Sequence, residues 1–165
     1  MITLELLTPQ NAMVFKDIRL RALLDTPSAF SSTYAKESQL TDTDWVKRAS
    51  RWSGEGSTGH LAINAGIPCG IACGYLDDDE STRAHLVSMW VAPAHRRLGI
   101  GCMLVNAIVD WARARSARTL ELIVTSNNDA AIKFYERLGF TLSGKADPYR
   151  NDPALNDLGM IRSIS

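Results

Sequence analysis

Excess charge of either sign is missing from this chain. Its 165 residues include 18 basic and 18 acidic side chains, so the formal net charge at pH 7 is zero. A neutral chain has no broad field with which to hold nucleic acid or an anionic membrane, so any basic patch must be local. The expected partner is therefore a small molecule or a peptide terminus, with no nucleic acid and no membrane.

Cysteines and long apolar runs are also scarce. The chain has three cysteines, Cys69, Cys73 and Cys102, and no histidine stands at metal-site spacing from them. We therefore expect no metal, and we expect Cys69 and Cys73 to be small apolar fillers. No apolar run reaches the roughly 18 residues that a membrane-spanning helix needs, and residues 1–7 lack the cationic start of a signal peptide. These absences predict a reduced, cytoplasmic protein with one domain over residues 1–165.

What the chain does contain is a buried strand, residues 87–91, that is followed by a glycine-bearing turn and a helix. The helix is indicated by apolar residues at the spacing of one helical face: Ile100, Met103, Leu104, Ala107, Ile108 and Trp111. A helix start leaves about four N–H groups without partners and carries about half a positive charge. Gly99 and Gly101 lack a Cβ atom, and Arg96 and Arg97 add charge, so this segment predicts a phosphate or pyrophosphate site.

Three phosphate-binding patterns compete for this segment, alongside the simpler alternative of a tight strand-to-helix turn. A nucleoside-triphosphate loop needs Gly-Lys-Ser/Thr, but Cys102 and Met103 follow Gly101. A dinucleotide loop needs a small residue where Leu104 stands and an acid at the end of the next strand, whereas Glu121 lies near that strand's start. The third pattern is Arg/Gln-x-x-Gly-x-Gly/Ala. This pattern matches, without a gap, six consecutive residues: Arg96, Arg97, Leu98, Gly99, Ile100 and Gly101.

This run resembles the coenzyme A pyrophosphate loop of the GCN5-related N-acetyltransferase (GNAT) superfamily. A second segment, residues 128–140, resembles the superfamily's other signature, in which Asn-x-x-Ala-x-x-x-Tyr is followed by Gly-Phe. Those positions are here Asn128, Ala131, Tyr135, Gly139 and Phe140. Two signatures in the expected order favour the resemblance over a simple turn.

Periodicity and turn residues predict the element order β-α-α-β-β-β-α-β-α-β-β. Strands are expected at residues 2–7, 60–65, 69–76, 83–91, 120–124, from 140, and 158–164. Helices are expected up to residue 24, after a cap at 41–44, from the glycines to 115, and after a Ser126-x-x-Asp129 cap. Residues 27–34, 66–68, 77–80 and 143–156 are expected to be loops or turns. The GNAT resemblance implies an α/β fold whose mixed sheet is antiparallel in its first half and splayed where two central strands part to admit the cofactor.

The resemblance also implies acetyl-CoA as the co-substrate. Its pyrophosphate would lie against the loop from Arg96 to Cys102, and its pantetheine arm along Met89, Trp90 and Val91. Trp90 could equally be a buried core aromatic. On the following helix Asn128, Ala131 and Tyr135 share one face, from which Asn128 would hydrogen-bond the arm.

By the same resemblance Tyr135 would be the general acid that protonates the leaving thiolate, although a core aromatic is the alternative. Several family branches carry a glutamate base on the motif strand, and His85 stands at that position. Imidazoles titrate near neutral pH, which suits a base, but a histidine that only hydrogen-bonds a neighbour fits as well. Phe30, Tyr34 and Tyr149, together with His85, are expected to border the acceptor pocket.

The sequence thus predicts an acetyl-CoA-dependent N-acetyltransferase. It would transfer the acetyl group to a primary amine of a small molecule or peptide by direct attack within a ternary complex. An acyl-enzyme on Cys102 is disfavoured, because that residue would face the phosphates. O-acylation, a longer acyl donor and a non-catalytic acyl-CoA sensor remain alternatives, and the resemblance leaves a homodimer open.

Overall fold

Seven strands form one mixed sheet in the order β1-β2-β3-β4-β5-β7-β6, in a computed structural model that describes residues 1–165. The strands are β1 (Ile2–Leu6), β2 (Ser57–Asn64), β3 (Ile67–Leu76), β4 (Arg83–Val91), β5 (Thr119–Thr125), β6 (Thr141–Tyr149) and β7 (Asp152–Ser163). Only β4 and β5 are parallel, and every other neighbouring pair is antiparallel. The predicted α/β fold with an antiparallel first half is confirmed.

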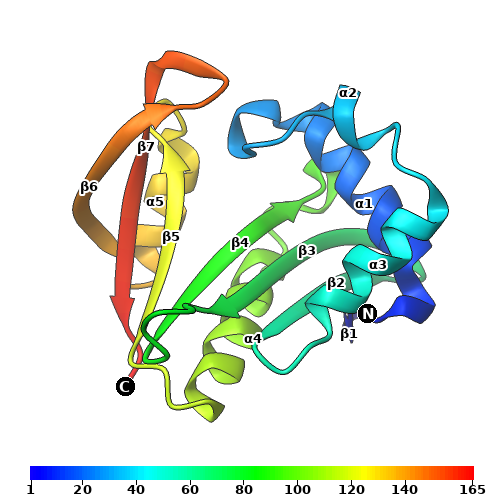
Figure 1. Ribbon diagram of the computed structural model, residues 1–165, viewed down its shortest axis with the longest axis horizontal. Coiled ribbons are helices and arrows are strands. Elements are labelled where there is room, and N and C mark those ends of the chain that lie inside the picture. Colours follow the sequence, from blue (N-terminus) through cyan, green and yellow to red (C-terminus); the bar gives the residue numbers. More distant parts are fainter.

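Helices cover both faces of this sheet. They are α1 (Ala12–Asp25), α2 (Tyr34–Glu37), α3 (Asp42–Trp52), α4 (Ile100–Ala114) and α5 (Asp129–Arg137). In Figure 1, α1 and α3 lie on one side of β2 and β3, α4 lies behind β3 and β4, and α5 lies behind β5. None of these helices is both long and apolar enough to cross a membrane.

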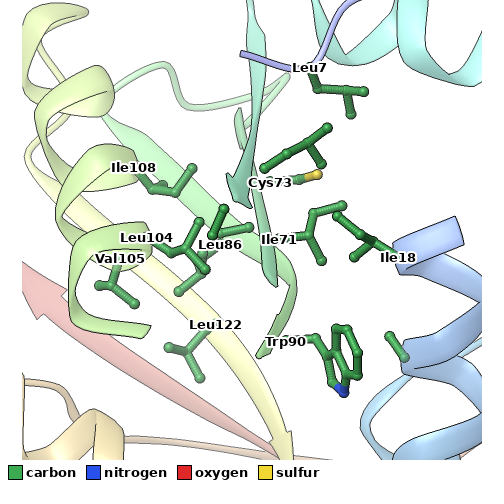
Figure 2. Close-up of a cluster of buried hydrophobic side chains, with 14 of the residues drawn as sticks. Leu7, Ile18, Ile71, Cys73, Leu86, Trp90, Leu104, Val105, Ile108 and Leu122 are labelled. Atoms are coloured by element: carbon green, nitrogen blue, oxygen red, sulfur yellow. The ribbon is translucent and has the colours of Figure 1, made fainter. Parts of the chain in front are cut away.

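The core lies between α4, the middle of the sheet and α1. Figure 2 shows Leu104 and Ile108 of α4 on one side of β3 and Ile18 of α1 on the other. α4 can approach β3 closely because the strand has glycines there: a Cβ on Gly70 would lie 3.1 Å from Leu104, and one on Gly74 would lie 2.9 Å from Ile108. Burial of these side chains is the main source of stability, at about 25 cal/mol for each Å² of apolar surface removed from water.

The predicted apolar face of α4 is correct in its centre and wrong at its edge. Ile100, Leu104 and Ile108 are buried as expected, but Met103 is 37% exposed. The buried face continues instead through Val105, Val109 and Ala112. The helix is therefore rotated slightly from the expected orientation, since a wide apolar helix offers more than one stripe to the sheet.

The two central strands separate after a short paired stretch. β4 and β5 pair only at Arg83↔Thr119, Ala84↔Leu120 and His85↔Glu121. Beyond these pairs the strands diverge, as Figure 1 shows between the green β4 and the yellow β5. The predicted splay is confirmed.

The expected loop at residues 143–156 is wrong. This segment forms most of β6 and the first part of β7, and the hairpin closes at Tyr149↔Asp152. Its register shifts twice, between Leu142 and Ala146 and between Pro148 and Tyr149, which accommodates Gly144 and Pro148. Every residue of β6 except Tyr149 is exposed, so the alternating pattern that reveals a half-buried strand is missing.

Three smaller differences concern turns and caps. The β2–β3 hairpin turns at Ala65 and Gly66, both at positive φ, and not over residues 66–68. Asn128 caps α5 by accepting a hydrogen bond from the Ala131 N–H at 3.1 Å, whereas Ser126 accepts one from the backbone of Asn156. The short helix α2 was not expected, and its cap is Thr33.

Candidate active site

Two cavities meet where β4 and β5 separate. The inner cavity, about 80 Å³, is lined by residues 86–89 of β4, residues 122–125 of β5, and Asn128, Ala131 and Tyr135. The outer cleft, about 750 Å³, lies between the end of β4, the start of α4 and the face of α5. Met89, Asn128, Ala131 and Tyr135 line both, so the two spaces adjoin at these residues.

The wall of the inner cavity contains a strained bulge in β4. Val87 pairs with Cys73 and Trp90 with Ile71, so two residues, Ser88 and Met89, stand opposite one residue of β3. Ser88 has a φ of 56°, a left-handed conformation that costs a serine free energy. Such bulges redirect side chains and peptide groups, and this one directs them where no β5 partner is present.

A buried ion-pair network holds Ser88 from behind. Arg19 of α1 donates to both oxygens of Glu37 at 3.0 Å, and its Nη1 donates to Ser88 Oγ at 3.2 Å. Arg48 of α3 donates to Glu37 at 3.0 Å. The Glu37 side chain is only 2% exposed. This carboxylate therefore connects α1, α2 and α3 with the reacting end of β4.

Glu37 remains ionised despite its burial. Burial alone would raise the pKa of Glu37, but the hydrogen bonds and charge of Arg19, with help from Ser32 and Arg48, hold it below the ordinary value. Arg19 is further held by the ring of Phe30, whose centroid lies 4.7 Å from its guanidinium carbon. The network is thus a fixed part of the fold.

The first turn of α4 opens into the outer cleft. Gly99 is its N-cap, with a φ of 82°, and no side chain caps the helix. The N–H groups at its start are therefore available to an anion, and the helix dipole adds positive charge. Arg97, Gly99, Ile100, Gly101 and Cys102 line the cleft at this point, whereas the exposed Leu98 is not among its lining residues.

Gly101 lacks a Cβ atom for a reason that the sequence does not show. A Cβ there would lie 2.9 Å from the ring of Phe134 and 3.3 Å from the terminal methyl of Met89. The space beside Gly101 is therefore filled by α5 and β4. By contrast, a Cβ on Gly99 would meet nothing within 4 Å.

Arg96 contacts the protein as well as the cleft. Its Nη2 donates to Asp25 at 2.6 Å and its Nε donates to the Val91 carbonyl at 2.9 Å. The indole of Trp90 donates to the same Asp25 oxygen at 3.0 Å, and Trp90 is only 5% exposed while also lining the cleft. Trp90 is therefore a buried aromatic, as one interpretation expected, and its place in the cleft wall leaves the contact with a cofactor a prediction. Although burial opposes it, hydrogen bonds from Trp90, Thr26 and Arg96 lower the pKa of Asp25, so this carboxylate stays charged.

α5 brings the predicted second signature to both cavities. Asn128, Ala131 and Tyr135 lie on its inward face, as expected. Tyr135 is 8% exposed, and burial raises its pKa above the ordinary value for a phenol. Tyr135 is therefore protonated at any working pH and can donate a hydrogen bond into the junction of the cavities.

His85 lies apart from this junction. It belongs to the last pair before β4 and β5 separate, and it lines neither cavity. Its Nε2 lies 2.8 Å from Asp77 Oδ2, and its ring stacks on Tyr75 at 4.8 Å between centroids. The structure thus places His85 beside a carboxylate, on the strand expected for a base but not next to Tyr135.

The three residues expected at the acceptor pocket do not line the cavities either. Tyr149 donates to the Phe30 carbonyl at 2.6 Å, so these two buried residues join the β6–β7 hairpin to the loop after α1. Tyr34 is 39% exposed at the start of α2. Phe30 and Tyr149 therefore build the wall behind the site.

Several residues of the site were not expected from the sequence. Arg19, Glu37, Ser88 and Thr125 come from four separate elements, and only a contact map or a burial pattern would associate them. His95 also lines the outer cleft, and its buried Nδ1 has no hydrogen-bond partner.

Comparison with known proteins agrees with this architecture. Residues 20–140 match the model of the acetyltransferase (GNAT) family. Streptothricin acetyltransferase of Streptomyces lavendulae is 48% identical over 54 residues, which are 33% of this chain and 29% of that protein. The probable N-acetyltransferase san of Drosophila melanogaster is 30% identical over 103 residues, 60% of this chain and 56% of that protein.

The matches to these curated relatives span only about a third to just over half of their length. A solved structure of yncA, a putative acetyltransferase from Salmonella typhimurium with its cofactor acetyl-CoA, superposes with a TM-score of 0.82 at 19% identity. That alignment covers all of this chain and 95% of the other, and it shows a shared fold. The chain therefore belongs to the acetyltransferase (GNAT) family.

Proposed function

We propose that this protein transfers the acetyl group of acetyl-CoA to a primary amine of a small molecule or peptide, by direct attack within a ternary complex. The observation that carries the proposal is that the two cavities adjoin at Met89 and Tyr135, which line both. The outer cleft is large and ends at the first turn of α4, which no side chain caps. The inner cavity is small and lies where β4 and β5 separate. Donor and acceptor can thus meet at one point.

The outer cleft fits a pyrophosphate-bearing thioester. The N–H groups from Gly99 to Cys102 would bind the pyrophosphate, with charge from Arg97 and, after exchange of its Asp25 contact, from Arg96. Backbone groups of Met89, Trp90 and Val91, with Asn128, would hold the amide arm against β4. Neighbouring structures that contain acetyl-CoA or coenzyme A support this donor.

At the junction the chain supplies a hydrogen-bond donor for the sulfur. Attack of the amine nitrogen on the thioester carbonyl breaks the carbon–sulfur bond, and the sulfur needs a proton. Tyr135 is protonated and lines both cavities, so we assign it this role. His85, paired with Asp77, is kept as the proposed proton acceptor for the ammonium, acting through water.

The test measures free thiol released from acetyl-CoA by purified protein over a panel of amines, with acetyl-CoA affinity measured by calorimetry. Tyr135→Phe should keep the affinity and lower kcat by roughly 10²-fold or more. Tyr34→Phe, the same loss of a hydroxyl at an exposed residue that lines neither cavity, should keep kcat within a few-fold. Tight binding with no transfer to any amine would instead identify an acyl-CoA sensor, and an unchanged kcat in Tyr135→Phe with chemistry rate-limiting would exclude the acid role.

A further inference from the structure

A row of three polar side chains crosses the sheet outward from the inner cavity. Thr125 of β5 pairs with Asp157 of β7, and Asp157 pairs with Asp147 of β6. Residues directly opposite in antiparallel strands point their side chains to the same face, about 5 Å apart. Thr125 lines the inner cavity, so the row Thr125, Asp157, Asp147 begins at the reaction site.

The hydroxyl at the inner end of this row lacks a partner. Thr125 is 4% exposed, and its Oγ1 is buried without a hydrogen bond. A buried polar group is almost always satisfied in a folded protein, so an unpaired hydroxyl in a cavity wall is available to a polar group of a ligand. The same face of β5 is open next to it, because Ile123 is 58% exposed.

The two carboxylates of the row are also without a cation. Neither Asp147 nor Asp157 takes part in any ion pair of the chain, and Lys145, two residues before Asp147, pairs with neither. Burial, and then the charge of Asp147, raise the pKa of Asp157. Facing like charges destabilise a strand pair, and a bound cation would relieve that repulsion.

We propose that Thr125, Asp157 and Asp147 form a subsite for a second positively charged group of the acceptor. This inference rests on the proposed function and specifies its substrate class: amines that carry a second ammonium. The reacting amine lies at Ser88, Met89 and Tyr135, and the second ammonium donates to Thr125 Oγ1 and to the Asp157 carboxylate. Thr125 and Asp157 stand on paired strands about 4.8 Å apart, so a short flexible diamine is the probe for this row.

The test compares three amines of one chain length with acetyl-CoA as donor: 1,5-diaminopentane, pentylamine and 5-aminopentanoate. Wild-type kcat/KM should be at least about tenfold higher for the diamine than for pentylamine, because only the diamine gains a charged hydrogen bond from its second ammonium. It should be lowest for 5-aminopentanoate, because its carboxylate is repelled by Asp157 and Asp147. Asp157→Asn should bring the diamine-to-pentylamine ratio close to one. Asp110→Asn, the same charge change at an exposed position of α4, should leave the ratio unchanged.

Thr125→Val separates binding from folding. It removes the orphan hydroxyl at nearly constant volume, so Tm should stay or rise while the diamine preference falls several-fold. If Thr125 had only a structural role, Thr125→Val would leave the diamine-to-pentylamine ratio unchanged. Equal wild-type kcat/KM for the diamine and pentylamine, or an unchanged ratio in Asp157→Asn, would overturn the subsite.

A separate readout keeps the subsite distinct from the proposed function. If none of the amines is acetylated, the proposed function fails for them, and the subsite is judged by binding alone. The backbone amide resonance of Thr125 should then shift on titration of wild type with 1,5-diaminopentane and remain in place in Asp157→Asn. No shift with the diamine would overturn the inference.

Discussion

The two sides of the cleft are built in different ways. The donor side uses consecutive residues, from Met89 to Cys102, and its proposed contacts are backbone N–H groups of an exposed turn and an uncapped helix. The acceptor side uses single side chains from separate elements, among them Arg19, Glu37 and Thr125; Glu37 and Thr125 are buried, and Arg19 is partly buried. Ser88 lies at the boundary, in a strained bulge held by Arg19.

This difference separates the energetics of the two sides. An exposed turn can be altered with little effect on folding, since surface substitutions away from special features change stability by less than about 0.5 kcal/mol. A buried ion-pair network cannot be altered without loss of stability, because removing one partner leaves an uncompensated buried charge. We therefore expect substitutions on the acceptor side to cost stability first, and substitutions on the donor side to cost binding first.

The largest expected effect concerns Glu37. Glu37→Gln leaves Arg19 and Arg48 without their carboxylate, so the free energy of unfolding should fall by about 3–5 kcal/mol. Asp17→Asn, which removes an exposed ion pair with Arg21 on α1, should cost about 0–0.5 kcal/mol. Urea denaturation measures both. Equal losses in the two variants would show that the network is no more than a surface contact.

The same network predicts a pH dependence. Because folding lowers the pKa of Glu37, its contribution is complete above the unfolded-state pKa of about 4.3 and is lost as the pH falls through the lower folded pKa. The difference in stability between wild type and Glu37→Gln should be constant from about pH 6 to 8 and shrink below about pH 4.5. A difference that grew on acidification would contradict the sign of the shift.

The donor side was predictable from sequence, and the acceptor side was not. Residues 96–101 and 128–135 are recognisable from local spacing alone, and the structure brings both segments to the outer cleft. Glu37 follows Ala35 and Lys36 in a stretch that reads as a solvated surface, although it is almost completely buried. Thr125 and Asp157 meet only because β5 pairs with β7.

The fold shows the same contrast. Strands with a buried face, such as β3 and β5, have apolar patterns, and they were predicted nearly to the residue. The β6 strand is paired by its backbone alone, so its side chains carry no pattern. The sequence therefore predicts elements that bury apolar surface and misses those held only by hydrogen bonds.

A medium effect is expected from the one close contact on the donor side. Gly101→Ala places a Cβ 2.9 Å from Phe134, so overpacking should lower the free energy of unfolding by about 1–3 kcal/mol. Phe134→Leu in the same chain should recover part of that loss, which a double-mutant cycle measures. Gly99→Ala, strained by its φ but free of contacts, should show no coupling to Phe134. If Gly101 serves only ligand approach, Gly101→Ala will weaken coenzyme A binding without destabilising the fold.

The smallest expected effect concerns His85, which lies on β4 but lines neither cavity. If it accepts the ammonium proton through water, kcat/KM should fall on acidification, because a charged imidazole cannot act as a base. His85→Gln should lower the rate at pH 8 by roughly tenfold or less, since a proton moved through water depends weakly on one group, and should flatten the acidic limb. The Asp77 carboxylate orients the His85 ring, and the hydrogen bond from His85 is the main cause that lowers the pKa of Asp77. Asp77→Asn removes this carboxylate. It should also lower kcat/KM at pH 8, because the ring loses the partner that fixes its orientation. Superposable profiles for wild type and His85→Gln on one acceptor would make His85 a structural residue of β4, and the proton would then leave through water or through the carboxylates of the β6–β7 hairpin.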